Sequence, residues 1–139
     1  MPPHVYLDIT DPKGIVRRVG FNIRPYTQKV LEAANKNFEV VVFTASNAEY
    51  ANNVINYIDP TGELIQHRFF RPHCILQEDV YIKDLRIFKN VDLKDILIVD
   101  NAVYSFGEQI DNGIPITPYK EDPGDTEFLN LIKYLDKCA

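Results

Sequence analysis

The stretch "EVVVFTASNAEYANNVINYID", residues 39–59, decides the fold because it joins a strand directly to a helix. Its apolar run, residues 40–43, lacks the polar alternation of a half-exposed strand. Continuous runs of this kind are typical of parallel sheets that helices cover on both faces. The run ends on the hydroxyl of Thr44. A polar residue at the carboxyl end of a buried strand raises the question of what it binds.

The residues after Thr44 predict a helix that begins at once. Ser46 and Glu49 have the spacing of a capping box, in which each side chain accepts a hydrogen bond from a free backbone N–H at the helix start. An apolar stripe with helical spacing follows, made of Ala51, Val54, Ile55 and Ile58. The sequence D-P-T-G at residues 59–62 is typical of a turn and predicts the end of the helix.

The N-terminal part of the chain predicts a β-hairpin. In residues 5–23 apolar and polar side chains alternate, and residues 11–14, D-P-K-G, carry turn chemistry. Arg24 and Pro25 then predict the start of a helix, since proline suits the first helical turn.

The rest of the chain alternates between short strands and helices. Strands are predicted within residues 64–70, 74–77, 95–100 and 113–117, and a helix capped by Asp125 within residues 125–138. This alternation predicts an α/β domain with a mainly parallel sheet, helices on both faces and the N-terminal hairpin.

Length and composition limit the classes of function. A chain of 139 residues favours one domain, and its net charge of −5 argues against a direct nucleic-acid partner, which would need a basic face. No apolar run approaches the length of a membrane span, and the N-terminus lacks a signal-peptide layout. Cys74 and Cys138 form no CxxC motif, so we expect free thiols.

Thr44 and Asp100 end two predicted parallel strands, and ligands bind at this edge of such sheets. The Thr44 hydroxyl and the N–H groups of Ala45 and Ser46 are suited to hold an anion at a helix start. Asp100 and Asn101 offer adjacent oxygen atoms for a hard cation such as Mg²⁺.

Lys83, in "YIKDL", could neutralise a phosphate placed between these groups. A hydroxyl, a lysine and a Mg²⁺-binding carboxylate together describe a phosphoryl-transfer site.

Four motifs in order, "FTASNAEYAN", "FFRPHC", "YIKDL" and "ILIVDNA", resemble the NLI-interacting-factor-like (FCP/SCP-type) phosphatases of the RNA polymerase II carboxy-terminal domain. These belong to the haloacid dehalogenase superfamily. The resemblance runs from about residue 4 to the C-terminus. It implies a single domain over residues 1–139 with a Rossmann-like haloacid-dehalogenase fold. It also implies Mg²⁺ dependence and a phosphorylated protein substrate carrying phosphoserine or phosphothreonine.

The resemblance implies catalytic roles for Thr44 as phosphate binder, for Lys83 as the lysine that holds the phosphate and the aspartyl intermediate, and for Asp100. Asp100 and Asn101 match the Mg²⁺ pair of the family. By the same carry-over, substrate-binding positions are Ala45, Ser46, Tyr50 and Arg71.

The first motif of the family, an aspartate pair of the form D-L-D-E-T-L, is absent from these residues. Its first aspartate is the nucleophile and its second the general acid and base. We therefore expect an N-terminally truncated domain that is itself inactive, within an active full-length protein. The alternative is a degenerate motif in "LDITD", with Asp8 as nucleophile and Thr10 or Asp11 beside it.

In the family the missing strand is central, between the strand that ends at Thr44 and the one that ends at Asp100. We expect a neighbouring chain to fill this place as a strand-exchanged dimer, or "HVYLDI" (residues 4–9) to move into it, or the flanking strands to close directly.

Two further alternatives concern function. A pseudophosphatase could serve as a protein-binding module, as in mitochondrial import, whereas the phosphatase hypothesis predicts a nuclear or cytoplasmic protein. A small-molecule phosphatase is disfavoured, because no insertion is long enough for a large cap.

Overall fold

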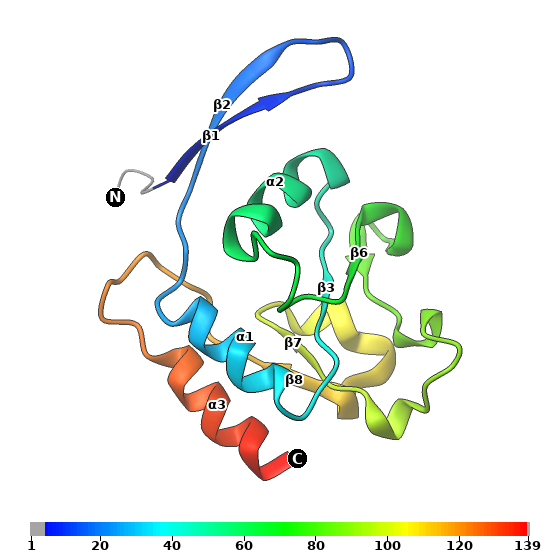
Figure 1. Cartoon of the computed structure of the whole chain (residues 1–139). Coiled ribbons are helices and arrows are strands. Elements are labelled where there is room, and N and C mark those ends of the chain that lie inside the picture. Colours follow the sequence, from blue (N-terminus) through cyan, green and yellow to red (C-terminus); the bar gives the residue numbers. More distant parts are fainter. Residues whose placement is uncertain (1–4, 139) are drawn as a thin grey trace.

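The computed structural model describes residues 5–138. Strands β1 (Val5–Thr10) and β2 (Val16–Phe21) form the predicted antiparallel hairpin, which extends away from the rest of the chain (Figure 1). Its turn is closed by Asp11, whose Oδ1 accepts hydrogen bonds from the N–H groups of Lys13 and Ile15 at 2.8 and 2.9 Å. The prediction of a hairpin with a D-P-K-G turn is confirmed.

Two short parallel pairs form the centre of the α/β domain. Strand β3 (Val41–Phe43) pairs with β4 (His67–Phe69), and β7 (Ile98–Asp100) pairs with β8 (Gly113–Pro115). Thr44 and Asp100 therefore lie at the carboxyl ends of two parallel strands, as predicted. The remaining strands, β5 (Ile75–Gln77) and β6 (Val80–Ile82), form a second antiparallel hairpin.

The described strands do not join into one continuous sheet. Within residues 5–138, β1 pairs only with β2, β3 only with β4, and β7 only with β8. Two of the expected ways to close the sheet are therefore wrong, since residues 5–9 of "HVYLDI" stay in the β1–β2 hairpin and the flanking strands do not pair directly. His4 lies outside the described residues. The alternating exposure of β1 explains the first result, because a central strand must be apolar on both faces. The strand-exchanged dimer stays a prediction.

Three α-helices surround these pairs: α1 (Thr27–Asn35), α2 (Ala48–Ile58) and α3 (Glu127–Cys138). Single 3₁₀ turns lie at η1 (Arg71–His73), η2 (Leu85–Ile87) and η3 (Leu93–Asp95), and a longer kinked segment forms η4 (Val103–Asn112). Helices α1 and α3 pack side by side, and η4 packs on β7 and β8 (Figure 1).

The predicted capping box of α2 is wrong. The cap residue is Asn47, which makes no side-chain cap hydrogen bond. The Ser46 N–H instead donates to Thr44 Oγ1 at 3.0 Å, so the threonine hydroxyl competes successfully for a group at the helix start. Helix α3 begins at Glu127, so Thr126 and not the predicted Asp125 is at the cap position. Asp125 Oδ1 still accepts from the Glu127 N–H at 3.1 Å, at the start of the helix.

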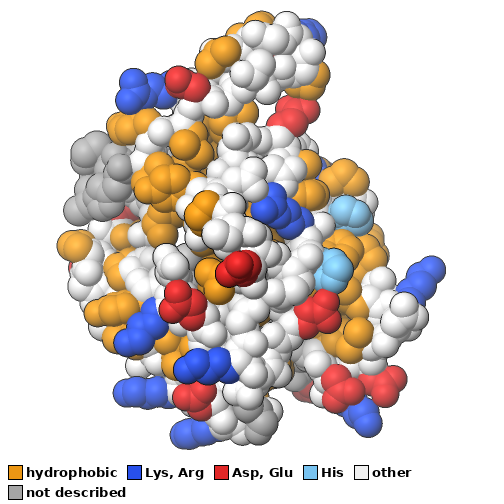
Figure 2. Space-filling view, in the orientation of Figure 1, with side chains coloured by type: hydrophobic (Ala, Val, Ile, Leu, Met, Phe, Trp, Pro, Cys, Tyr) orange, Lys and Arg blue, Asp and Glu red, His pale blue; other side chains and the backbone are white. Residues whose placement is uncertain are grey.

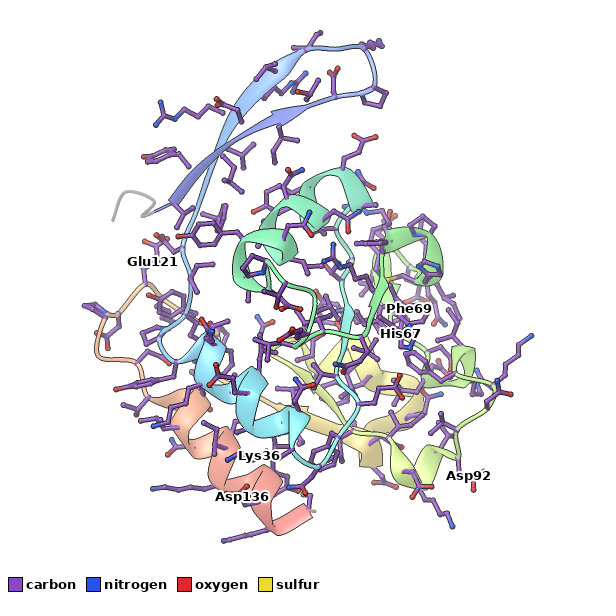
Figure 3. The ribbon with its side chains drawn as sticks, viewed as in Figure 1. Lys36, His67, Phe69, Asp92, Glu121 and Asp136 are labelled. Atoms are coloured by element: carbon purple, nitrogen blue, oxygen red, sulfur yellow. The ribbon has the colours of Figure 1, made fainter. Side chains whose placement is uncertain are left out.

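The buried apolar residues form two clusters. One joins α2 to the segment before β4 and contains Ala51, Ile55 and Ile65. The other joins η2, β7 and η4 and contains Leu85, Ile98 and Phe106. The rings of Phe43, Phe69 and Phe88 contact one another at centroid distances of 5.0–6.2 Å and connect the β3–β4 pair to the η2 region (Phe69 is labelled in Figure 3).

Within residues 5–138, every helix is too short or too polar to cross a lipid bilayer. On the face seen in Figure 2, acidic and basic side chains are interspersed over the domain.

Candidate functional site

A cavity of about 470 Å³ opens at the carboxyl ends of β3 and β7. Most of the predicted site residues line it: Thr44, Ala45, Ser46, Arg71, Lys83, Asp100 and Asn101. Tyr50 is the exception, because its side chain lies on α2 and does not line the cavity. The other lining residues are Asp79, Val80, Tyr81, Ala102, Tyr104 and Ser105.

Thr44 is positioned by the strand that precedes it. Its N–H donates to the Phe69 carbonyl at 2.9 Å, which continues the β3–β4 ladder by one step. Its Oγ1 accepts from the Ser46 N–H, and the hydroxyl proton is left to be donated elsewhere. The expectation that the Ser46 N–H is open to an anion is therefore corrected, whereas the Thr44 hydroxyl can still donate to one.

Arg71 ties the cavity wall to the loop after β3. Its backbone N–H donates to the Ser46 carbonyl at 3.1 Å, and its Nε donates to the Ala45 carbonyl at 2.7 Å. The guanidinium lies 5.0 Å from the ring centre of Tyr81. These contacts hold the positive charge of Arg71 at the cavity. The two terminal nitrogens of its guanidinium have no hydrogen-bond partner among the described residues and can donate to a ligand.

Lys83 and Asp100 form a partly buried ion pair. Lys83 Nζ lies 2.5 Å from Asp100 Oδ2, and the two side chains are only 12% and 9% exposed. The second carboxylate oxygen, Oδ1, accepts from the Ala102 N–H at 2.9 Å. The backbone N–H of Lys83 donates to the Ser105 carbonyl at 2.7 Å. Both ends of the pair are thus fixed to η4 and the residues before it.

A buried polar network, not predicted from the sequence, fixes the residues that directly follow Lys83. Gln109 Nε2 donates to Asp84 Oδ1 at 2.8 Å, and Gln109 Oε1 accepts from the Leu85 N–H at 2.9 Å. Hydrogen bonds from Arg86 lower the pKa of Asp84 to about 2, although burial opposes the shift. The acidic residue next to Lys83 in "YIKDL" was a sequence signal for this network, but its partner Gln109 is 25 residues away.

Cys74 contacts the backbone of Thr44. Its Sγ is 3.9 Å from the carbonyl oxygens of Thr44 and Phe70. Burial raises the pKa of the thiol, and the positive charges of Lys83 and Arg71 only partly oppose this. Cys74 and Cys138 are both free thiols, as predicted.

The donor set fits a Mg²⁺ ion only in part. Asp100 and Asn101 supply the oxygen atoms that a hard cation prefers. Within the described residues, however, no group of three or more His, Cys, Asp or Glu side chains could hold a metal. The Lys83 ammonium also competes for Asp100 Oδ2. A further carboxylate would be needed to complete the site.

Asp8 does not supply that carboxylate. It is exposed on β1, opposite Arg18 on β2, and is absent from the cavity lining. Asp11 is engaged in the hairpin turn. The alternative of a degenerate first motif in "LDITD" is therefore wrong for this structure, because these residues belong to the β1–β2 hairpin and its turn, which extends away from the rest of the chain (Figure 1), and none of them lines the cavity.

An α/β fold whose parallel strands end in a hydroxyl and a lysine-paired carboxylate defines a class of proteins that handle phosphate groups. The chain belongs to the NLI interacting factor-like phosphatase family, whose family model matches residues 2–139.

Several curated relatives are similar to the chain. CTD small phosphatase-like protein 3 of Caenorhabditis elegans is 41% identical over 124 residues, which cover 89% of this chain and 43% of that protein. CTD nuclear envelope phosphatase 1 of Xenopus tropicalis is 37% identical over 135 residues, or 97% and 54% of the two chains. Nuclear envelope morphology protein 1 of Saccharomyces cerevisiae is 35% identical, with coverage of 81% and 28%. The chain thus spans about half or less of each relative.

Solved structures agree on the fold. Fission yeast Fcp1, an RNA polymerase II CTD phosphatase solved bound to beryllium fluoride, has a TM-score of 0.71 at 20% identity, over 96% of this chain and 38% of that one. This likeness confirms the predicted α/β fold. Among the described residues, two parallel and two antiparallel strand pairs stand in place of the predicted mainly parallel sheet.

Proposed function

We propose that this chain forms the phosphate-binding part of a Mg²⁺-dependent protein serine/threonine phosphatase domain. The observation that carries the proposal is the cavity in which the Thr44 hydroxyl, the Lys83 ammonium and the Asp100 carboxylate meet. Membership in a family of phosphatases supports it.

Each of these residues has a proposed role in binding. Thr44 donates its hydroxyl proton to a phosphoryl oxygen, and Lys83 and Arg71 neutralise the charge that the phosphoryl group carries. Asp100 and Asn101 hold Mg²⁺, which supplies further charge stabilisation when bound. The Lys83 ammonium would then interact with both Asp100 and the phosphate, so binding of the anion competes with the ion pair.

The attacking carboxylate is proposed to come from a D-x-D-x-T segment, which the 139 residues do not contain. Asp100 is paired with Lys83 and hydrogen-bonded to Ala102, so it is poorly placed to act as a nucleophile itself. Loss of a nucleophile from a coupled catalytic unit costs up to about a millionfold in rate. We therefore propose that these residues alone bind phosphate groups and turn them over poorly.

The substrate is proposed to be a phosphorylated protein segment, of which the RNA polymerase II tail is one candidate on the names of the relatives. Names such as CTD nuclear envelope phosphatase 1 favour a nuclear or nuclear-envelope setting over the mitochondrial alternative. A pseudophosphatase would bind the same segments without turnover, and a strand-exchanged dimer would bring the missing carboxylate from a second chain.

The test is Mg²⁺-dependent hydrolysis of an aryl phosphate by a form of the protein that includes a D-x-D-x-T segment. We expect turnover, and a loss of about a hundredfold in kcat/KM for Thr44→Val, because one pre-organised donor is removed. Thr61→Val, in an exposed turn, is the matched control and should retain full activity. No Mg²⁺-dependent turnover by that form would overturn the phosphatase proposal in favour of a binding module. Turnover by the 139-residue chain alone would contradict the proposed source of the nucleophile.

A further inference from the structure

The tip of the β5–β6 hairpin reaches the cavity. Gln77 pairs with Val80, so Glu78 and Asp79 form a two-residue turn. Both have positive φ, 49° and 65°, as a two-residue hairpin turn of the I′ type requires. Asp79 lines the cavity, whereas its neighbour Glu78 does not. The tight turn therefore fixes one acidic residue at the cavity and leaves an equivalent one outside it.

The charge of Asp79 has no partner within the described part of the chain. Neither a hydrogen bond nor an ion pair to another described residue satisfies its carboxylate. Neither cationic lining residue pairs with Asp79: Lys83 pairs with Asp100, and Arg71 uses its Nε for the Ala45 carbonyl and lies over the Tyr81 ring. A lone carboxylate on the wall of an anion-binding cavity repels the anion, unless a cation arrives with it.

The cavity has room for more than the phosphate group, and an aromatic surface lies within it. Tyr104 lines the cavity and is 58% exposed. The Tyr81 ring, in contrast, is already covered by Arg71. An exposed aromatic side chain and a lone carboxylate on the wall of one cavity suit the long stem and charged head of a lysine or arginine.

We propose that Asp79 determines specificity by selecting phosphoprotein segments with a lysine or arginine close to the phosphorylated residue. The inference rests on the proposed function, because it places the phosphate at Thr44 and Lys83. The basic side chain then pairs with Asp79 and covers Tyr104. A substrate with an acidic residue in that place meets the repulsion instead.

The test measures binding of fluorescein-labelled peptides to the full chain by fluorescence polarisation. The peptides carry one phosphoserine and differ only in having lysine, alanine or glutamate at positions within two residues of it. We expect lysine to bind about two- to fivefold more tightly than alanine at one or more positions, as a partly exposed charge pair allows, and glutamate to bind more weakly. The preference should shrink in high salt.

Asp79→Asn is the test variant, since asparagine tolerates positive φ and removes only the charge. It should abolish the lysine preference while retaining phosphate-dependent binding. Glu78→Gln is the matched control, because it removes an equal charge from the same turn outside the cavity, and it should keep the preference.

Two outcomes separate the claims. Phosphate-dependent binding without a lysine preference, or a preference that survives in Asp79→Asn, overturns the specificity proposal and leaves the proposed function standing. Equal binding of phosphorylated and unphosphorylated peptides overturns both.

Discussion

The two walls of the cavity are held in different ways. The threonine wall, residues 44–46 with Arg71, is fixed mainly by backbone hydrogen bonds to β4 and η1. The lysine wall is formed by Lys83 and Asp100, which line the cavity, and is supported by Asp84 and Gln109, which do not. It is fixed by half-buried or buried charges and amides. Removing a side chain from the first wall leaves the backbone framework in place. Removing one from the second leaves a desolvated partner unsatisfied.

The largest expected effect is therefore on the lysine wall. Lys83→Met should lower the free energy of unfolding by about 3 kcal/mol, because Asp100 is left as an unpaired, mostly buried carboxylate. Urea denaturation of the variant and of Lys133→Met, an exposed lysine on α3, would measure the difference. Adding Asp100→Asn should recover part of the loss. Equal stability of the two lysine variants would show that the ion pair contributes nothing to this wall.

Packing behind the lysine wall gives the next effect. A Cβ at Gly113 would overlap the ring of Phe106, which is 1% exposed, so Gly113→Ala should destabilise by about 1–3 kcal/mol through overpacking. Gly107→Ala, in the same region, meets nothing within 4 Å and is the matched control. Thermal denaturation compares the two. Equal melting temperatures of the two alanine variants would contradict the close packing of Gly113 in β8 against Phe106 in η4.

Asp84 should give the lysine wall an acid-sensitive stability. The folded pKa is lowered from 3.8 to about 2, so the carboxylate stabilises the fold above pH 4 and this contribution is lost as the pH falls towards 2. Since Arg86 is mostly exposed, we expect about 1 kcal/mol. Asp84→Asn should flatten stability between pH 4 and 2. Asp92→Asn, at an exposed site, should keep the wild-type curve; matching curves for both variants would refute the assignment.

The same comparison explains what the sequence could predict. Thr44 and Asp100 end apolar runs, and hydrophobic patterning alone places strand ends well, so both were found. One short-range contact of the threonine wall was not predicted. The Ser46 N–H donates to the Thr44 hydroxyl, whereas the capping-box pattern assigned this N–H to the Glu49 side chain.

The lysine wall depends on contacts between distant residues. Lys83 follows β6 in an irregular segment, so no strand or helix pattern predicted its place. Its charge suggested a phosphate partner, and the resemblance to a family motif gave it a role. Gln109 and Ser105 belong to a kinked 3₁₀ segment, whose packing no periodicity encodes. Asp79 reaches the cavity because of a two-residue turn, and the acidic pair alone gave no signal of which member would face inward.

The smallest expected effect on stability, and the most direct test of the account, is on the threonine wall. Amide ¹⁵N–¹H spectra of the full chain would be recorded during titration with inorganic phosphate and Mg²⁺. The account predicts saturable shifts centred on Thr44, Ala45, Lys83 and Ala102. In Thr44→Val these shifts should weaken sharply, while stability changes by less than about 1 kcal/mol. Shifts that cluster elsewhere, or that are the same in Thr44→Val, would contradict the claim that this cavity binds the phosphoryl group.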